Sequence, residues 1–157
     1  ADTIIFDTGA GISNESLRFM LSSDEVILVT TPEPTAITDA YAVIKMLHFY
    51  NPRTTIRLVV NRVTSAREGT MTAQKLVMVA KRFLNMDIHP LGFVLDDPHV
   101  SKAVKLQRPF LLAFPHAQAS RDIRHLSAVY LGKEAGGRQS LPAGIGGFLQ
   151  KLRRFIR

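Results

Sequence analysis

An aspartate followed by small residues is the first feature of this chain that could do chemistry. Asp7 ends the apolar run Thr3–Phe6, and Gly9 and Gly11 follow it closely. A carboxylate at the tip of a strand can orient Mg²⁺ through water, and small residues let backbone amides approach a phosphate. The alternative is an ordinary strand that ends in a tight turn.

Three further loops carry polar or turn-forming residues directly after an apolar run. They contain Pro32 and Glu33, then Asn61 and Arg62, then Asp96, Asp97 and Pro98. Open α/β sheets bind ligands outside the carboxyl ends of their strands, which is where such loops would lie. The side-chain amide of Asn61 both donates and accepts, as the edge of an adenine requires. Each loop taken alone is equally typical of a capped turn.

The elements that would position these residues are four short runs rich in β-branched residues. They are Thr3–Phe6, Val26–Thr30, Ile56–Val60 and Leu91–Leu95. Each is nearly continuous rather than alternating, which favours strands that are buried on both faces of a parallel sheet. Helical periodicity is found between and after them, over Thr35–Tyr50, Glu68–Leu84, Val100–Leu106 and Ala119–Leu131. This alternation predicts an α/β fold with a doubly wound, mostly parallel sheet.

Composition narrows the classes of protein further. The chain has 157 residues, of which 46% are hydrophobic, and it has no cysteine. This excludes a disulfide scaffold, a thiol nucleophile and a thiolate metal site, and no apolar stretch is long enough for a transmembrane helix. The first residues form a strand-like run without a start methionine, which indicates a fragment or a processed chain.

The end of the chain has a different character, and the net charge of +7 is concentrated there. Residues 1–131 read as one domain, 132–144 as a flexible polar linker, and 145–157 as an amphipathic helix. Its apolar stripe consists of Ile145, Phe148, Leu149, Leu152, Phe155 and Ile156, and its basic residues are Lys151, Arg153, Arg154 and Arg157. Such a helix is typical of a peripheral anchor on an anionic membrane. The alternative is a helix docked on the domain itself, and the same helix could do both in turn.

Taken in order, the motifs resemble a known family. The segments IIFDTGAGIS, LVTTPEPTAITDAYAVIK, LVVNRVTSAREG and LGFVLDDPHVSKAVKLQRPFLLAFPHAQASRDIRHLS are similar to the MinD/FlhG (FleN) branch of the ParA-like deviant P-loop ATPases. The resemblance covers residues 1–131 almost continuously. The segment TTPEPTAITDAYAVIK favours the FlhG regulators of flagellar number over MinD.

The resemblance implies a role for each motif. Asp7 would bind Mg²⁺ through water, with Gly9 and Gly11 in the catalytic switch that follows it. Asn61 with Arg62 would bind the base, and Asp39 would lie near an ATP-dependent dimer face. Further nucleotide contacts would come from Pro32, Glu33, Asp96, Asp97 and Pro98.

One departure from the family is large. The phosphate-binding signature G-x-x-x-x-G-K-[ST] is absent from this sequence. We therefore expect the chain alone neither to bind ATP appreciably nor to hydrolyse it. The family's phosphate-loop strand, which would lie between Thr3–Phe6 and Val26–Thr30, is also missing. We expect these two strands to pair directly, or a second copy to fill the gap, because Ile4, Ile5 and Phe6 are too apolar to lie in water.

In function, the resemblance implies an ATPase that regulates flagellar number or placement through ATP-dependent dimerisation, using ATP and Mg²⁺. It would be cytoplasmic and peripheral at the inner face of the cell membrane. The implied partners are an anionic membrane surface, a second copy, and flagellar assembly proteins such as a FlhF-type GTPase. The alternatives are a ParA-like DNA-partitioning ATPase and a scaffolding module without a P-loop. DNA is disfavoured because binding it would not require the apolar face at Phe148, Leu149 and Phe155.

Overall fold

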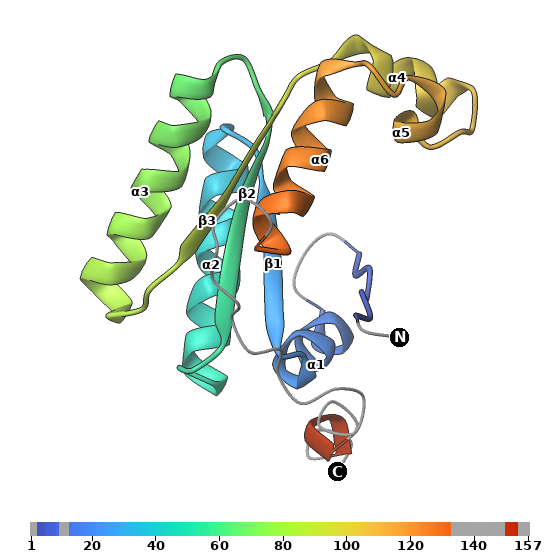
Figure 1. The fold of residues 1–157 in the computed structure, drawn as a ribbon. Coiled ribbons are helices and arrows are strands. Elements are labelled where there is room, and N and C mark those ends of the chain that lie inside the picture. Colours follow the sequence, from blue (N-terminus) through green and yellow to red (C-terminus); the bar gives the residue numbers. More distant parts are fainter. Residues whose placement is uncertain (1–2, 10–12, 133–149, 154–157) are drawn as a thin grey trace.

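Three parallel strands form the sheet in the computed structural model, which describes residues 3–9, 13–132 and 150–153 (Figure 1). The strands are β1 (Glu25–Thr30), β2 (Thr55–Val63) and β3 (His89–Leu95), and their order in the sheet follows the sequence. Leu28 lies beside Leu58 and Val60 beside Phe93 in the register. All strands point the same way, so their carboxyl ends meet at one edge of the sheet.

Helices cover the two faces of this sheet unequally. On one face, α2 (Pro34–Tyr50) and α3 (Ala66–Leu84) bury the larger core, where Ile44, Leu47 and Leu76 are almost completely inaccessible to water. On the other face, α6 (Gln118–Tyr130) packs on β3, and Leu126 contributes to a smaller apolar cluster there (Figure 1).

Gly92 permits the close approach of α6 to β3. The strand has an irregular register where Val59 pairs with Gly92, and the φ angle of Gly92 is 150°. A Cβ atom on Gly92 would lie 2.6 Å from Cδ2 of Leu126. The bulge in the strand and the contact with the helix therefore both require a residue without a side chain.

A cluster of charged and aromatic side chains contacts the carboxyl end of α6. The Arg57 guanidinium pairs with Glu25 at 3.0 Å, which joins β2 to β1, and lies 5.7 Å from the centre of the Tyr130 ring. Burial raises the pKa of Tyr130, and the nearby negative charge of Glu25 raises it further. The cluster thus connects the amino end of the sheet with the last turn of α6.

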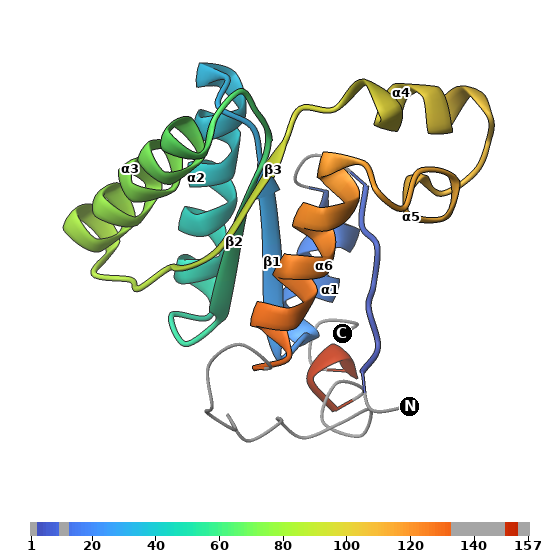
Figure 2. The same cartoon turned by 45° about the horizontal axis from the view of Figure 1, so that its top comes forward.

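The helices α1, α4 and α5 differ in how they contact these layers. The helix α1 (Asn14–Ser22) precedes β1 and contributes Leu17 and Leu21 to the larger core. The helices α4 (Pro98–Lys105) and α5 (Phe110–Ala113) follow β3 and project beyond the end of the sheet, as Figure 2 shows.

Most of the predicted elements are confirmed. The runs at 26–30, 56–60 and 91–95 lie in β1, β2 and β3, and the four predicted helices are α2, α3, α4 and α6 with ends shifted by at most two residues. The helices α1 and α5 were not predicted.

The predicted first strand is wrong. Residues 3–9 have no regular secondary structure and do not pair with β1, and Ile5 is 81% exposed. Phe6 stacks on Phe19 of α1, with ring centroids 5.6 Å apart. Direct pairing of this segment with β1 is therefore excluded in this structure, and exchange with a second copy stays untested.

The prediction that each strand is buried on both faces is also wrong for β1. Its side chains alternate between buried and exposed, and Ile27 and Val29 are 44% and 57% exposed. Within the described part of the chain β1 is an edge strand, and α6 covers β3 rather than β1 on that face. The apolar character of β1 therefore exceeds what the described residues cover.

Candidate functional site

The carboxyl edge of the sheet brings two of the predicted nucleotide-binding loops together. The Nε atom of Arg62, near the carboxyl end of β2, lies 3.6 Å from Oδ1 of Asp96, directly after β3. The backbone amide of Asp96 donates to the carbonyl of Val63 at 2.9 Å, which extends the parallel pairing into the loop. Both charged side chains are largely exposed, so the ion pair itself contributes little to stability.

Asn61 and Arg62 lie in the irregular end of β2, where its register with β3 shifts between Val60 and Val63. Arg62 has a φ angle of 57°, a left-handed conformation that is costly for a residue with a side chain. Its backbone amide donates to Oδ1 of Asn61 at 2.9 Å, which stabilises this irregular strand end. The side-chain NH₂ group of Asn61 makes no hydrogen bond with a described residue, so it is available as a donor to a base.

Pro32 and Glu33 lie at the same edge, between β1 and α2. Oε2 of Glu33 accepts from the hydroxyl of Thr31 at 2.9 Å, so this carboxylate is engaged within its own turn. Pro32 lines a groove of about 280 Å³, whose other lining residues are Ile37, Ser65, Arg67, Glu68, Met71, Thr72 and Lys75. Asn61, Arg62 and Asp96 do not line this groove.

Sequence reasoning missed the basic side of this groove, which α3 provides. Ser65 caps α3 by accepting from the amide of Glu68 at 3.2 Å, and Glu68 accepts from the amide and hydroxyl of Thr64. The hydrogen bonds from Thr64 lower the pKa of Glu68, and the bond from the Thr64 backbone amide contributes most. The Glu68 carboxylate is therefore engaged within its own turn. Arg67 and Lys75 therefore dominate the charge of the groove. The spacing of Ser65 and Glu68, typical of a capping box, was the available signal for where this helix begins.

Asp39 lies in the second turn of α2 and is exposed. It lines a second groove, of about 260 Å³, with Pro34, Thr35 and Thr38. Its position at the surface is compatible with a dimer face, and that role stays a prediction.

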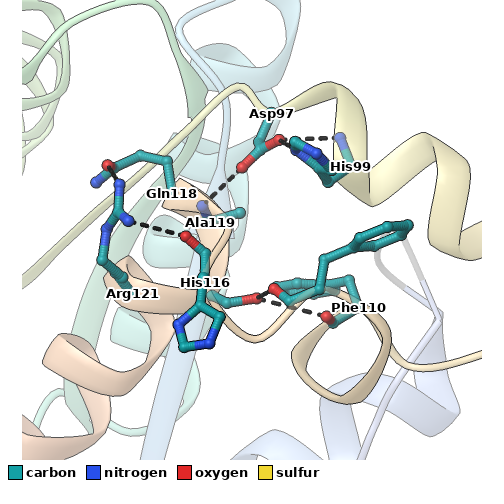
Figure 3. Close-up of polar contacts among 9 residues, drawn as sticks. Asp97, His99, Phe110, His116, Gln118, Ala119 and Arg121 are labelled. Carbon is teal, nitrogen blue, oxygen red and sulfur yellow. Dashed lines mark hydrogen bonds and ion pairs between the residues drawn. The ribbon is translucent and has the colours of Figure 1, made fainter.

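Asp97 is buried and caps two helices at once. Its Oδ1 atom accepts from the backbone amide of His99 at 2.9 Å, in the first turn of α4, and its Oδ2 atom accepts from the amide of Ala119 at 3.1 Å, in the first turn of α6 (Figure 3). The His99 ring nitrogen Nδ1 lies 2.8 Å from Oδ1. The hydrogen bond from the His99 amide contributes most to lowering the pKa of Asp97 to about 2, although burial opposes the shift.

Asp97 was predicted to contact a nucleotide, together with Pro98. Its two oxygens are instead engaged by donors of the protein, and Pro98 occupies the first position of α4, where a missing N–H costs nothing. The pattern Asp-Pro before a helical segment was the signal for this cap. A part for either residue in a nucleotide wall stays a prediction.

Asp7 is not brought to this edge by any contact of the described residues. It is exposed, as is Gly9, and the segment that carries both lies beside α1 (Figure 2). Gly11 lies outside the described residues. The predicted catalytic roles of Asp7, Gly9 and Gly11 therefore stay predictions, and no cluster of three metal-binding side chains occurs in the described part of the chain.

The predicted membrane helix is described only at Gln150–Arg153, where the backbone is helical. There Lys151 Nζ lies 3.0 Å from Oδ1 of Asp24, just before β1. Leu152 is partly buried and Arg153 is exposed. Outside the described residues lie most of the predicted linker and Ile145, Phe148, Leu149, Arg154, Phe155 and Ile156. In the part of the chain that the structure describes, no helix is both long and apolar enough to cross a bilayer.

Known proteins resemble this chain over most of its length, although no protein-family model matches it. It is 40% identical to the antiactivator FleN of Pseudomonas aeruginosa over 119 residues, which are 76% of this chain and 42% of FleN. It is 31% identical to the flagellum site-determining protein YlxH of Helicobacter pylori over 157 residues, which are 99% of this chain and 53% of YlxH.

A third relative is named for determining the site of a septum. The chain is 32% identical to the septum site-determining protein MinD of Bacillus subtilis over 158 aligned positions, which are 99% of this chain and 56% of MinD. The chain thus spans about half the length of these relatives. Together with the motifs and the parallel α/β fold, these identities show that the chain belongs to the MinD/FlhG branch of the ParA-like ATPases.

Proposed function

We propose that this chain is part of an FlhG-type ATPase that controls the number or placement of flagella at the membrane through ATP-dependent dimerisation. The observation that carries the proposal is the 40% identity to FleN, a higher value than the 32% identity to MinD. YlxH is named as a flagellum site-determining protein, and FleN is named as an antiactivator. The juxtaposition of Arg62 and Asp96 at the carboxyl edge supports a binding site there.

In the proposed site, ATP with Mg²⁺ would supply the phosphoryl group whose transfer to water drives the cycle. Asn61 would donate its side-chain NH₂ to the base, and Arg62 would be positioned against it by Asp96. Asp7 would orient Mg²⁺ through a water molecule, and the backbone at Gly9 would approach the terminal phosphate. The residues of this chain fit the base side of the site, whereas its sequence contains no phosphate-binding loop.

Changing Asp7 to alanine in the complete protein should abolish ATP hydrolysis and reproduce the effect of deleting the gene. The carboxylate is needed to hold Mg²⁺, and without hydrolysis the dimer cannot be recycled. Flagella per cell, counted by electron microscopy, should rise to the number seen in the deletion strain. Phosphate release by the purified variant should fall to the background rate.

Asn61→Ala provides the contrast for this experiment, because loss of a base contact should raise the KM for ATP more than it lowers kcat. Hydrolysis at the wild-type rate by the Asp7 variant would refute its assignment. A deletion strain with normal flagella and minicells would show that the septum, rather than the flagellum, is the target.

We further propose that the end of the chain anchors the protein to anionic membranes. Five of the six apolar side chains of the stripe would each contribute up to about 1.5–3 kcal/mol if fully buried. They are Phe148, Leu149, Leu152, Phe155 and Ile156. Each basic residue near an anionic surface would add roughly 1 kcal/mol. The ion pair between Lys151 and Asp24 supports a docked state of the same segment, which would compete with lipid.

Sedimentation with vesicles tests the anchor. The full chain should sediment with vesicles that contain anionic lipid and less with neutral vesicles, because both the charge and the apolar face contribute. Phe148→Glu should abolish most of this binding, since it places a charge on the buried face. Phe49→Glu is the matched control, because Phe49 is an exposed phenylalanine at the end of α2. Equal sedimentation of the wild type and the Phe148 variant would rule the anchor out.

A further inference from the structure

The segment 98–117, which we name the α4–α5 arm, has an exceptional surface. It carries Lys102, Lys105 and Arg108 and has no acidic residue. None of these three cations forms an ion pair with a described residue. Between and beside them, Val104, Leu106 and Leu112 are 70%, 57% and 71% exposed. Single exposed aliphatic residues are common, but three of them in one short segment that also carries three unpaired charges of one sign are typical of an interaction surface.

Hydrogen bonds fix the base of the α4–α5 arm against α6, so the exposed side chains belong to an ordered segment. The Asp97 carboxylate joins the first turn of α4 to the first turn of α6. The hydroxyl of Ser120, which is completely buried in α6, donates to the carbonyl of Phe114 at 2.8 Å, and the rings of Phe114 and His99 are 5.0 Å apart (Figure 3). The exposure of these side chains is therefore not caused by fraying of a helix end.

The outer turn of the arm is also ordered. Gln107 adopts a left-handed φ angle of 51°, and the amide of Arg108 donates to the carbonyl of Ala103 at 3.1 Å. These bonds end α4 in the manner of a Schellman turn and orient Leu106 outward. The segment that carries these six residues projects beyond the end of the sheet (Figure 2).

Position and chemistry distinguish between possible partners of this surface. The arm follows the carboxyl end of β3, whereas Lys151 contacts Asp24 at the amino end of β1, so the arm and the C-terminal segment lie at opposite ends of a parallel sheet (Figure 1). A lipid surface that receives the C-terminal segment there would not reach the arm. Nucleic acid is disfavoured because the side chains between the cations are aliphatic, whereas single strands are bound by stacking on aromatic rings.

We infer that the α4–α5 arm is a docking surface for an amphipathic helix of a partner protein, with aliphatic residues on one face and aspartate or glutamate beside them. The aliphatic face would cover Val104, Leu106 and Leu112, and the carboxylates would pair with Lys102, Lys105 and Arg108. Charge complementarity of this kind steers association, while the apolar contacts provide most of the affinity. The inference goes beyond nucleotide binding and membrane anchoring, because neither requires this surface.

A labelled synthetic helix with leucines on one face and glutamates beside them is the probe, and fluorescence anisotropy with the full chain is the measurement. We expect saturable binding that weakens as salt is raised. The double variant Lys102→Glu with Lys105→Glu should weaken binding at least tenfold. Val104→Asn with Leu112→Asn should have a similar effect without changing the charge. These side chains are exposed, so circular dichroism should show an unchanged fold.

The matched control is Lys45→Glu with Arg82→Glu, which reverses the same amount of charge at exposed positions of α2 and α3, away from the arm and from the groove. This control should bind the probe as the wild type does. Equal weakening in the control and the arm variants would overturn the inference, since binding would then follow net charge alone. So would a loss of probe binding on addition of anionic vesicles to a variant truncated before Gln150, because lipid would then be the occupant of the arm.

Discussion

Asp97→Ala is expected to lower the free energy of unfolding by about 2–4 kcal/mol, since two helix caps are lost and the buried amide of Ala119 is left without a partner. The helices α4 and α6 both begin at this carboxylate, so one substitution affects both. Urea denaturation followed by circular dichroism measures the change. Amide exchange should increase first at the amino ends of α4 and α6.

The same carboxylate should make stability depend on pH. Its pKa in the folded protein is about 2, below the ordinary value of 3.8. A depressed folded pKa stabilises the protein above the unfolded pKa, and this stabilisation is lost as the pH falls through the folded value. Between about pH 4 and pH 2 the wild type should therefore lose more stability than the Asp97→Ala variant.

Asp96→Ala is the control for both measurements. Asp96 is the adjacent carboxylate, but it is exposed and pairs with Arg62 only at the surface, so its removal should cost less than about 1 kcal/mol. If the two alanine variants were equally stable, the double capping by Asp97 would be refuted.

The second large effect is expected at Gly92. Alanine there should destabilise the protein by roughly 2–5 kcal/mol, from the strain of a positive φ angle and from overpacking against Leu126. The new Cβ would lie 2.6 Å from Cδ2 of Leu126, so α6 must shift away from β3. The thermal midpoint of unfolding, measured by calorimetry, should fall by several degrees.

Gly9→Ala is the matched substitution, because a Cβ on Gly9 would meet no atom within 4 Å. Combining Gly92→Ala with Leu126→Ala gives a second measure, since removal of the Leu126 side chain should recover the part of the cost that comes from the clash. Additive destabilisation in the double variant would show that the contact between Gly92 and Leu126 is not the cause.

The sequence predicted the elements whose burial is complete within this chain. Ile44, Leu47 and Leu76 repeat with helical spacing because the sheet covers that side of α2 and α3. The same logic explains the error at Ile4, Ile5 and Phe6. An apolar run indicates that a segment prefers burial. A strand forms only where a neighbouring strand also pairs with its backbone N–H and C=O groups. The helix α1 was missed because its capping partner is Ser16 instead of the expected Glu or Gln.

The candidate site was predictable in its location and less so in its details. Parallel strands oblige Arg62 and Asp96 to meet at the carboxyl edge, as the strand-and-loop order implied. The role of Asp97 could not be derived in this way, because one of its two partners is the amide of Ala119, far along the chain. A cap between residues far apart in the chain leaves no signal in the sequence. A local cap does leave one, here the pair Asp97-Pro98 before a helical segment.

The uncovered edge of β1 has a practical consequence for the isolated chain. Its outer backbone groups have no strand partner in the described sheet, and Ile27 and Val29 add an apolar strip beside them without a lysine or proline to discourage pairing. Such edges recruit further strands from other molecules. Concentrated solutions of this chain should therefore form assemblies by strand addition, independently of nucleotide. Self-association of the isolated chain is consequently no measure of ATP-dependent dimerisation, and a solubilising change such as Val29→Lys belongs in any preparation used to study it.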